Sequence, residues 1–290
     1  MNPPDYEYLR KLLKERSGLD LSADKQYLIE SRLLPLSRKC GVAGIGELVQ
    51  KMKDGSASVV SQAVEAMTTN ETFFFRDKVP FDHFRDPIMS ELLKARAGRK
   101  SIRIWCAAGS TGQEPYSLAM CLKEMSAATA GFRIEIIATD LSQEVLEKSR
   151  AGIYSQFEVQ RGLPIQLLVK YFRQTGEFWQ INADIRAMVQ HRQLNLLHDF
   201  SGLGVFDAIF CRNVLIYFDQ DTKVNVFNRL AKAVEADGFL VLGAAETVVG
   251  LTDTFKPCPD KRGLYRPSGA SAALVVTGPA MPRMAAMAGR

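Results

Sequence analysis

The sequence contains one segment in which an apolar run, a glycine loop and a helical pattern follow one another: Ser101-Ile102-Arg103-Ile104-Trp105-Cys106-Ala107-Ala108-Gly109-Ser110-Thr111-Gly112-Gln113-Glu114-Pro115-Tyr116-Ser117. Residues 102–106 are apolar and rich in β-branched and aromatic side chains, which is typical of a buried strand. Pro115 suits the first turn of a helix, and apolar residues then recur at helical spacing up to Leu122. Strand, glycine loop and helix of this kind form the nucleotide-binding corner of a doubly wound α/β sheet.

The residues around this corner narrow the class of ligand. A pyrophosphate site would show G-x-G-x-x-G or a loop that ends in G-K-S/T, and neither pattern is present. The helix instead opens with Glu114, and Asp140 follows the next apolar run, residues 132–139. An acid after the second strand can hold ribose hydroxyls. Two acids without a phosphate-binding base favour a positively charged nucleoside such as S-adenosylmethionine, although a glycine loop can also be only a tight turn.

Composition limits the class of protein. The 290 residues allow one large or two modest domains, and no run of about 18 apolar residues predicts a membrane span. The N-terminus lacks a signal pattern, so we expect a cytoplasmic protein that does not insert into membranes. Five scattered cysteines indicate reduced thiols and no structural metal. The net charge of +5 is too low for the basic stripe of a nucleic-acid-binding protein, and no nucleic-acid partner is expected.

Residues 1–78 are predicted to form a helical domain with helices over about 5–16, 25–39, 45–53 and 57–67. Within it, Lys25, Arg32 and Lys39 recur every seven residues, which places them along one side of a helix. This row is either a solvated face or a docking surface for an acidic helix. No large apolar stripe is left unassigned, so a monomer is expected.

The segment Asn70-Glu71-Thr72-Phe73-Phe74-Phe75-Arg76-Asp77 follows the helical domain. Three consecutive phenylalanines cannot all face one core from a regular helix or strand, so we expect this segment to cross between two packed surfaces. Arg76, directly after the apolar run, is either a buried ion-pair partner or a ligand contact. Residues 79–100 are predicted as a linker helix over 79–97 and a basic linker, whose charge we interpret as serving solubility.

Residues 101–267 are predicted to form a mainly parallel α/β domain because strands and helices alternate. Ser142 is expected to cap the helix that runs to Arg150. Residues 153–193 interrupt the alternation, and their strand-like pieces at 172–174, 178–181 and 188–191 predict a small antiparallel insertion with a hairpin turn at 175–177. Residues 268–290 lack acids and periodicity and are predicted to be a disordered tail.

Five motifs follow one another along the chain: residues 70–77 and 109–117, quoted above, Ala138-Thr139-Asp140, Asn195-Leu196-Leu197 and Phe210-Cys211-Arg212-Asn213-Val214-Leu215-Ile216-Tyr217-Phe218. Together they resemble the CheR family of chemotaxis receptor methyltransferases over about residues 5–267. The resemblance implies a helical N-terminal domain and a Rossmann-like methyltransferase domain with an inserted β-subdomain. It also implies S-adenosylmethionine as cofactor, S-adenosylhomocysteine as product, and methyl esterification of glutamates on the cytoplasmic helical domain of chemoreceptors.

The resemblance also implies the site residues. Those expected at the cofactor are Asn70, Thr72, Arg76, Glu114, Asp140 at the ribose, Asn195 and Leu196 at the adenine, and Cys211, Arg212 and Asn213 at the methionine end. Arg76 and Tyr217 are expected nearest the methyl group and are the candidate catalytic residues. From the residues alone, Arg76 can also be an ion-pair partner of Asp77 or Glu71, and Tyr217 can be a core aromatic.

Two positions depart from the family pattern. Ser110 follows Gly109 where the family commonly has a cysteine, and its similar size predicts no loss. The hairpin at 175–177 is shorter than in members that bind a receptor's C-terminal pentapeptide, so we expect no pentapeptide binding.

The chemistry expected of such a site needs no general base, because a glutamate with a pKa of about 4.3 is already ionised at neutral pH. Lys25, Arg32 and Lys39 would steer acidic receptor helices to the N-terminal domain. Two other functions remain open: methylation of a nucleic acid or small molecule, and a non-catalytic module that senses S-adenosylmethionine.

Overall fold

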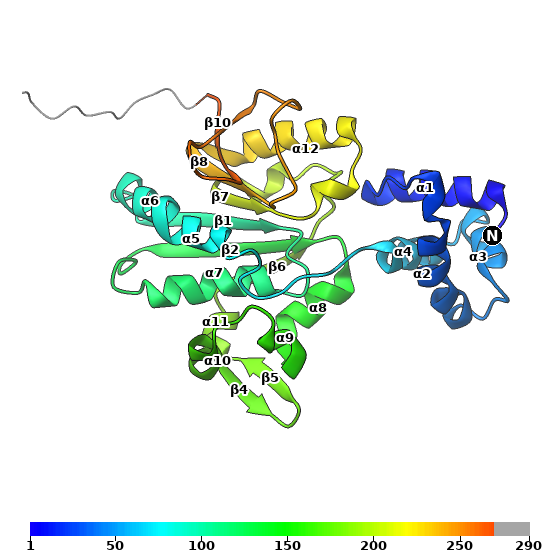
Figure 1. Cartoon of the computed structure of the whole chain (residues 1–290), viewed down its shortest axis with the longest axis horizontal. Coiled ribbons are helices and arrows are strands. Elements are labelled where there is room, and N and C mark those ends of the chain that lie inside the picture. Colours follow the sequence, from blue (N-terminus) through cyan, green and yellow to red (C-terminus); the bar gives the residue numbers. More distant parts are fainter. Residues whose placement is uncertain (270–290) are drawn as a thin grey trace, which may run out of the picture.

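The computed structural model describes residues 1–269. Most of the predicted tail, residues 270–290, lies outside this range. The described chain consists of a helical domain, a central sheet covered by helices on both faces, and a small sheet that projects from one side (Figure 1). The predicted fold class is confirmed, because the central sheet is mainly parallel and alternates with helices in the chain.

The central sheet has seven strands in the order β6-β2-β1-β7-β8-β10-β9. Strands β1 and β2 pair in parallel, as do β2 and β6, β1 and β7, and β7 and β8, whereas β10 pairs antiparallel with β8 and β9. Because the parallel strands point the same way, their carboxyl ends meet at one edge. The strand bounds are β1 (Ser101–Ala107), β2 (Arg133–Asp140), β6 (Val189–Gln193), β7 (Phe206–Cys211), β8 (Val234–Leu242), β9 (Phe255–Pro257) and β10 (Leu264–Pro267).

Alternate side chains of each buried strand enter two different cores. Ile104 and Cys106 of β1 join the core that also contains residues of α7 (Gln113–Glu124), whereas Trp105 and Ala107 join the core that contains residues of α12 (Gln220–Ala233). In Figure 1, α7 and α8 (Gln143–Ala151) lie on one side of the sheet and α12 on the other. Ser142 caps α8 as expected, by accepting the Val145 backbone N–H.

The helical domain has its own core, separate from the two cores of the sheet. Its helices are α1 (Pro3–Ser17), α2 (Gln26–Lys39), α3 (Ile45–Lys53) and α4 (Ala57–Met67). The phenylalanine segment follows α4. Phe74 and Phe75 both belong to the core that contains residues of α7, whereas Phe73 is only partly buried, so the three rings do not all enter one core. The ring of Phe74 packs edge-on against Tyr154 and Phe172 at 5.0 and 5.5 Å, while Phe75 packs against Phe81 at 5.2 Å.

The insertion carries a three-stranded antiparallel sheet in the order β3-β5-β4, from β3 (Ile153–Ser155), β4 (Phe172–Thr175) and β5 (Phe178–Ile181). Its helices are α9 (Gln156–Gln160), α10 (Ile165–Tyr171) and α11 (Ala183–Arg186). The prediction was wrong for the last strand-like piece: β6 pairs in parallel with β2, at the edge of the central sheet. A strand's own sequence does not identify its pairing partner, so the pattern alone could not assign β6.

The predicted helix over 79–97 is broken. It forms α5 (Val79–His83) and α6 (Met89–Ala95), and Asp86 between them has an extended backbone, with φ −156° and ψ 121°. The reason is Pro87, whose ring disfavours helical geometry at the preceding residue.

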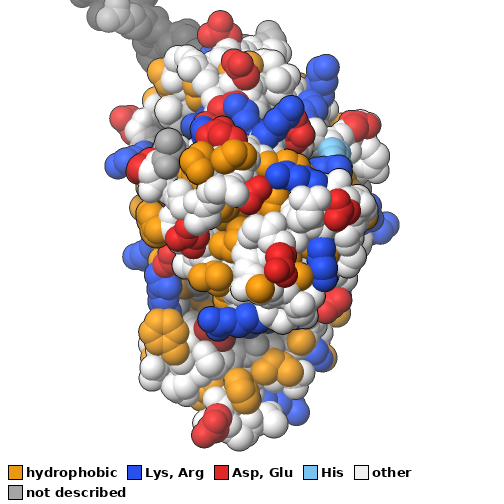
Figure 2. Space-filling model, turned by 90° about the vertical axis from the view of Figure 1, so that its right-hand side faces the viewer, with side chains coloured by type: hydrophobic (Ala, Val, Ile, Leu, Met, Phe, Trp, Pro, Cys, Tyr) orange, Lys and Arg blue, Asp and Glu red, His pale blue; other side chains and the backbone are white. Residues whose placement is uncertain are grey.

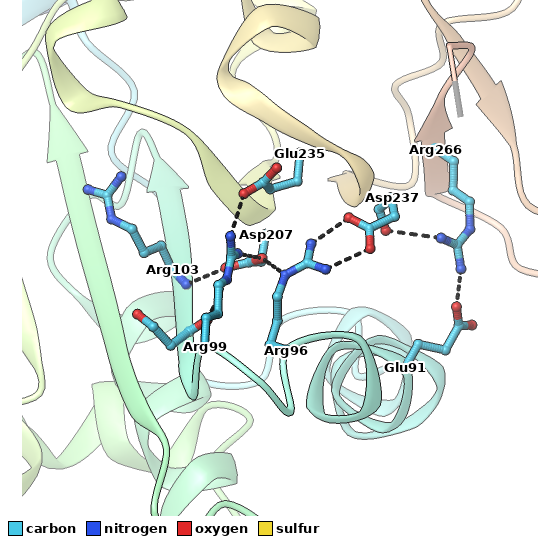
Figure 3. A network of polar contacts seen from close by, with 9 residues as sticks. Glu91, Arg96, Arg99, Arg103, Asp207, Glu235, Asp237 and Arg266 are labelled. Atoms are coloured by element: carbon cyan, nitrogen blue, oxygen red, sulfur yellow. Dashed lines mark hydrogen bonds and ion pairs between the residues drawn. The ribbon is translucent and has the colours of Figure 1, made fainter. Parts of the chain in front are cut away.

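The interpretation of the basic linker as a solubility feature was also wrong. Arg96 is 7% exposed, and its Nε donates to the Oδ1 of Asp207 at 2.6 Å. Both of its terminal nitrogens donate to Asp237, and Arg99 joins Asp207 to Glu235 (Figure 3). These ion pairs fasten the linker to the starts of β7 and β8, at the edge of the sheet opposite the glycine loop.

Candidate cofactor and active site

The glycine loop is held in a conformation that needs small residues. Gly112 has a φ of +97°, and a Cβ added there would lie 2.3 Å from the Oγ of Ser149 and 2.9 Å from the ring of Tyr116. The Gly109 N–H donates to Thr139 O at 2.9 Å, which ties the loop to the end of β2. The loop therefore turns sharply from β1 into α7 and leaves space above the carboxyl ends of the strands.

That space is a cavity with about 1000 Å³ of empty volume, its open mouth included. It is lined by nearly all residues predicted for the site: Asn70, Thr72, Arg76, Glu114, Asp140, Asn195, Leu196, Arg212, Asn213 and Tyr217. Cys211 is the exception. It is fully buried in the core that contains residues of α12, so its thiol packs as a small apolar group away from the cavity.

Asp140 lies where β2 ends, and its carboxylate is 7% exposed. Its Oδ2 accepts the Ser110 N–H at 2.9 Å, and its Oδ1 accepts the Ser142 N–H at 3.0 Å. Burial raises the pKa of the Asp140 carboxyl above its ordinary value, and these two N–H groups oppose that shift. The carboxylate thus both shapes the glycine loop and presents an acceptor to the cavity.

Glu114 and Arg212 form a buried ion pair at the base of the cavity. Arg212 Nη1 donates to Glu114 Oε2 at 2.7 Å, and Nη2 donates to the carboxylate of Asp77 at 2.8 Å. Burial raises the pKa of Glu114, while the Arg212 charge acts in the opposite direction. The guanidinium is therefore paired with two acids, and it holds the Glu114 carboxylate in position.

Arg76 reaches the cavity from the segment that joins the two domains, and it forms neither of the ion pairs that the sequence left open. Its Nη1 donates instead to the backbone oxygen of Glu71 at 2.7 Å, and its guanidinium lies 5.6 Å from the ring centre of Phe73. Arg161 of the insertion packs on the same ring at 4.5 Å and pairs with the Glu71 carboxylate at 2.6 Å. Within residues 1–269, Arg76 has no carboxylate partner, so its charge is available to an acidic ligand.

Tyr217 lines the cavity and is half-buried, so it is not a fully buried core aromatic. It belongs to a short helical turn, Leu215–Tyr217, that follows Asn213. Asn213 has a φ of +58°, a conformation that side chains other than those of Asn and Asp rarely adopt. The turn is bound by Glu246, which no motif indicated. The only signal in the sequence was an acid four residues beyond the next strand.

The helical domain contributes a wall that the sequence did not predict. Ser17 and Leu19 line the cavity beside Leu196, and Asn195 Nδ2 donates to the backbone oxygen of Arg16 at 2.7 Å. The amide of Asn195 is therefore used to join the two domains. On the other side, Glu65 accepts the hydroxyl of Ser142 at 2.6 Å, next to Asp140.

The row of basic residues, with Lys25 directly before α2 and Arg32 and Lys39 within it, does not form a single surface. Lys25 and Lys39 are exposed, but Arg32 donates to Met67 O at 2.6 Å and Thr68 O at 2.9 Å. Arg32 thereby binds the last carbonyls of α4, which corrects its expected role as a free docking cation. On the face seen in Figure 2, Lys and Arg side chains lie among acidic and apolar ones.

The cavity fits S-adenosylmethionine. Asp140 offers an acceptor for hydroxyls, and Glu114 offers a carboxylate for an ammonium group. Leu141, Leu194 and Leu196 supply an apolar wall suited to a purine. Gly109 packs closely against β2, since an added Cβ would lie 3.3 Å from that of Ala138.

Comparison with known proteins gives the family. Residues 4–68 match the family described as CheR methyltransferase, all-alpha domain, and residues 70–264 match CheR methyltransferase, SAM binding domain. The chain is 40% identical over 256 residues to Chemotaxis protein methyltransferase 1 of Pseudomonas aeruginosa, which covers 87% of this chain and 93% of that protein. Identity is 39% to Chemotaxis protein methyltransferase 1 of Vibrio cholerae, over 87% of this chain and 92% of that one.

A third relative is the Chemotaxis protein methyltransferase of Escherichia coli, which is 35% identical over 86% of both chains. None of the helices within residues 1–269 combines the length and the apolar composition needed to cross a membrane. The cavity above the strand ends and the match of both domains lead to one conclusion: the chain belongs to the CheR methyltransferase family and is an S-adenosylmethionine-dependent methyltransferase.

Proposed function

We propose that this enzyme transfers a methyl group from S-adenosylmethionine to glutamate side chains of chemoreceptors, working in the cytoplasm as a monomer. The products would be a glutamyl methyl ester and S-adenosylhomocysteine. The observation that carries this proposal is the cavity itself, in which Asp140 and Glu114 suit the cofactor while Arg76 has its charge free for an acidic acceptor. The names of the relatives support an acceptor within a chemotaxis pathway.

The chemistry requires alignment more than proton transfer. Bound S-adenosylmethionine supplies an electrophilic methyl group on a sulfonium, and an ionised glutamate is already a nucleophile because its pKa is about 4.3. No histidine is among the described residues that line the cavity, in keeping with a reaction that needs no general base. In this proposal Arg76 orients the substrate carboxylate by hydrogen bonds, and Tyr217 shapes the path beside it.

We propose that receptor helices dock on α2 through Lys25 and Lys39, since Arg32 is engaged with α4. A Lys25→Glu, Lys39→Glu double variant should raise KM for receptor several-fold and leave cofactor affinity unchanged. Lys94→Glu is the matched control, because Lys94 is also exposed but lies on α6. An equal KM in the double variant and the control would leave the solvated-face interpretation in place.

We further propose that binding does not depend on a C-terminal receptor pentapeptide. The edge strands of the small sheet, β3 and β4, have three and four residues, and only Gly176 and Glu177 separate β4 from β5. An added peptide strand would find few backbone groups to pair with. Calorimetric titration with a receptor pentapeptide should show no binding, and a micromolar dissociation constant would contradict this proposal.

The decisive experiment is transfer of a radiolabelled methyl group to membranes that contain the organism's own chemoreceptors. Label on the receptor that is released as methanol in mild alkali would establish a glutamyl ester. Tight cofactor binding without receptor labelling would contradict the proposal and favour a sensor of S-adenosylmethionine. Label that resists alkali, or that appears on RNA or a small molecule, would indicate a different acceptor.

A further inference from the structure

Glu246 lies four residues beyond Leu242, the last residue of β8, and it is 9% exposed. Its side chain reaches the turn that follows β7. Its carboxylate accepts four backbone N–H groups. Oε2 accepts from Asn213 and Gly243, both at 2.8 Å, and Oε1 accepts from Val214 at 3.0 Å and Leu215 at 2.8 Å. A single side chain thus satisfies the donors of three consecutive residues in the turn and one in its own loop.

The turn needs this support because its backbone is strained. Asn213 has a φ of +58°, and no regular helix or strand ladder binds the N–H groups of residues 213–215. Backbone donors buried without partners each cost about 1–3 kcal/mol. The carboxylate is closely packed here, since a Cβ added at Gly243 would lie 2.8 Å from both the side-chain Nδ2 of Asn213 and the Oε2 of Glu246.

The same turn carries part of the cavity wall. Asn213, Val214 and Tyr217 all line the cavity, and the backbone oxygen of Tyr217 accepts the Asp20 N–H of the helical domain at 2.9 Å. Glu246 itself does not line the cavity, and its two oxygens are occupied by four donors. It therefore has no free lone pair directed at a substrate proton, which excludes a role as general base.

The geometry points to Glu246 as a positioning residue that holds the turn of residues 213–217 in the shape required to bind the cofactor and place Tyr217. The inference rests on the proposed function only for the role of Tyr217. Binding of the cofactor product can be measured without any acceptor, so a failure to methylate receptors would leave this inference testable on its own.

The test is Glu246→Gln, which keeps the shape of the side chain but replaces one oxygen by an amide that cannot accept. Two of the four donors then lose their partner. We expect S-adenosylhomocysteine to bind about tenfold more weakly or worse by calorimetry. At saturating cofactor, kcat should fall while KM for receptor stays the same, because the docking face on α2 is untouched.

Asp207→Asn is the matched control. Asp207 is 1% exposed and also accepts a backbone N–H, that of Arg103 at 2.7 Å, but it lies at the opposite end of β7. Both variants should melt at lower temperature than the unchanged protein, and only Glu246→Gln should lose affinity for S-adenosylhomocysteine. Unchanged affinity in Glu246→Gln, or an equal loss in both variants, would overturn the inference.

A second measurement does not depend on the variant folding. In the unchanged protein without ligand, hydrogen exchange of the amides at 213, 214 and 215 should be slow, as for amides bound to a buried acceptor. Exchange as fast as that of an exposed loop, such as residues 176–177, would mean that the carboxylate does not hold the turn and would overturn the inference.

Discussion

Replacement of Asp140 by Asn tests how the cofactor is recognised. The Asp140 carboxylate accepts two backbone N–H groups, that of Ser110 at 2.9 Å and that of Ser142 at 3.0 Å. Asp140 itself is 7% exposed. In Asp140→Asn one of these donors faces an amide group, which should cost about 1–3 kcal/mol of folding free energy. If the carboxylate also accepts a ribose hydroxyl, the variant should bind cofactor about tenfold more weakly, about 1.4 kcal/mol.

The two effects can be separated with a ligand that lacks the hydroxyl. S-adenosylhomocysteine and its 2′-deoxy analogue should be titrated against the unchanged protein and Asp140→Asn by calorimetry. A direct contact predicts that the deoxy analogue loses about tenfold in affinity for the unchanged protein but little for the variant. The coupling energy should then be about 1 kcal/mol or more.

The reasoning is refuted if the deoxy analogue loses the same factor with both proteins, a coupling below about 0.3 kcal/mol. Asp140 would then act only by shaping the glycine loop through Ser110. Acid provides an independent check. Because burial raises the pKa of Asp140, protonation should begin to weaken cofactor binding at a higher pH than for an ordinary aspartate, and Asp140→Asn should lack this dependence.

Two further predictions concern stability. Burial lowers the pKa of His191, which bonds to Ser149, to about 4, so the folded state binds fewer protons than the unfolded chain between pH 6.5 and 4. Stability should therefore fall as pH drops through this window, by at most about 3 kcal/mol because solvent screens this partly exposed group. Urea titrations should show a shallower fall in His191→Gln, and an equal slope would contradict the assignment. A Cβ at Gly162 (φ +83°) would lie 2.1 Å from Phe74 O, so Gly162→Ala should cost about 2 kcal/mol or more. In the control Gly176→Ala (φ +61°) nothing lies within 4 Å, and equal thermal shifts in the two variants would refute the steric argument.

Local patterns predicted the parts of the fold that depend on neighbouring residues. The apolar run of β1 and the periodicity of α7 are set within a few residues, and Ser142 caps the helix that directly follows it. The alternation of strands and helices along the chain then indicated a mainly parallel sheet. These features needed no knowledge of distant contacts, and the structure confirms them.

The features that the sequence did not predict depend on residues far apart in the chain. The local sequence indicates that Arg96 is a surface charge, because its partner Asp207 lies 111 positions away. In the same way, the local sequence indicates that β6 belongs to the insertion, whereas in the structure β6 pairs with β2. Pairing partners are chosen by three-dimensional packing, which a linear pattern does not contain.

The site residues divide in the same way, into those that local patterns predict and those that depend on distant parts of the chain. Motif residues such as Asp140 and Arg76 were found, because acids and cations beside glycine loops or apolar runs are recognisable locally. Ser17 and Leu19 carry no chemical signal and enter the site only because the helical domain folds over the cavity. Cys211, taken from a motif, turned out to point into the core, since neighbouring residues on a strand face opposite sides.

The contacts that join the helical domain to the rim of the cavity have a consequence for how cofactor binding depends on salt. One is the ion pair between Lys14 and Asp219, which are 48% and 22% exposed and 2.6 Å apart. Because Ser17 and Leu19 form part of the wall, this rim also sets the shape of the cofactor cavity. Dissolved salt screens such an exposed pair, whereas the buried pair of Arg96 and Asp207 at the opposite ends of the strands is shielded from it. Ionic strength should therefore act on cofactor affinity through this rim while leaving the sheet intact.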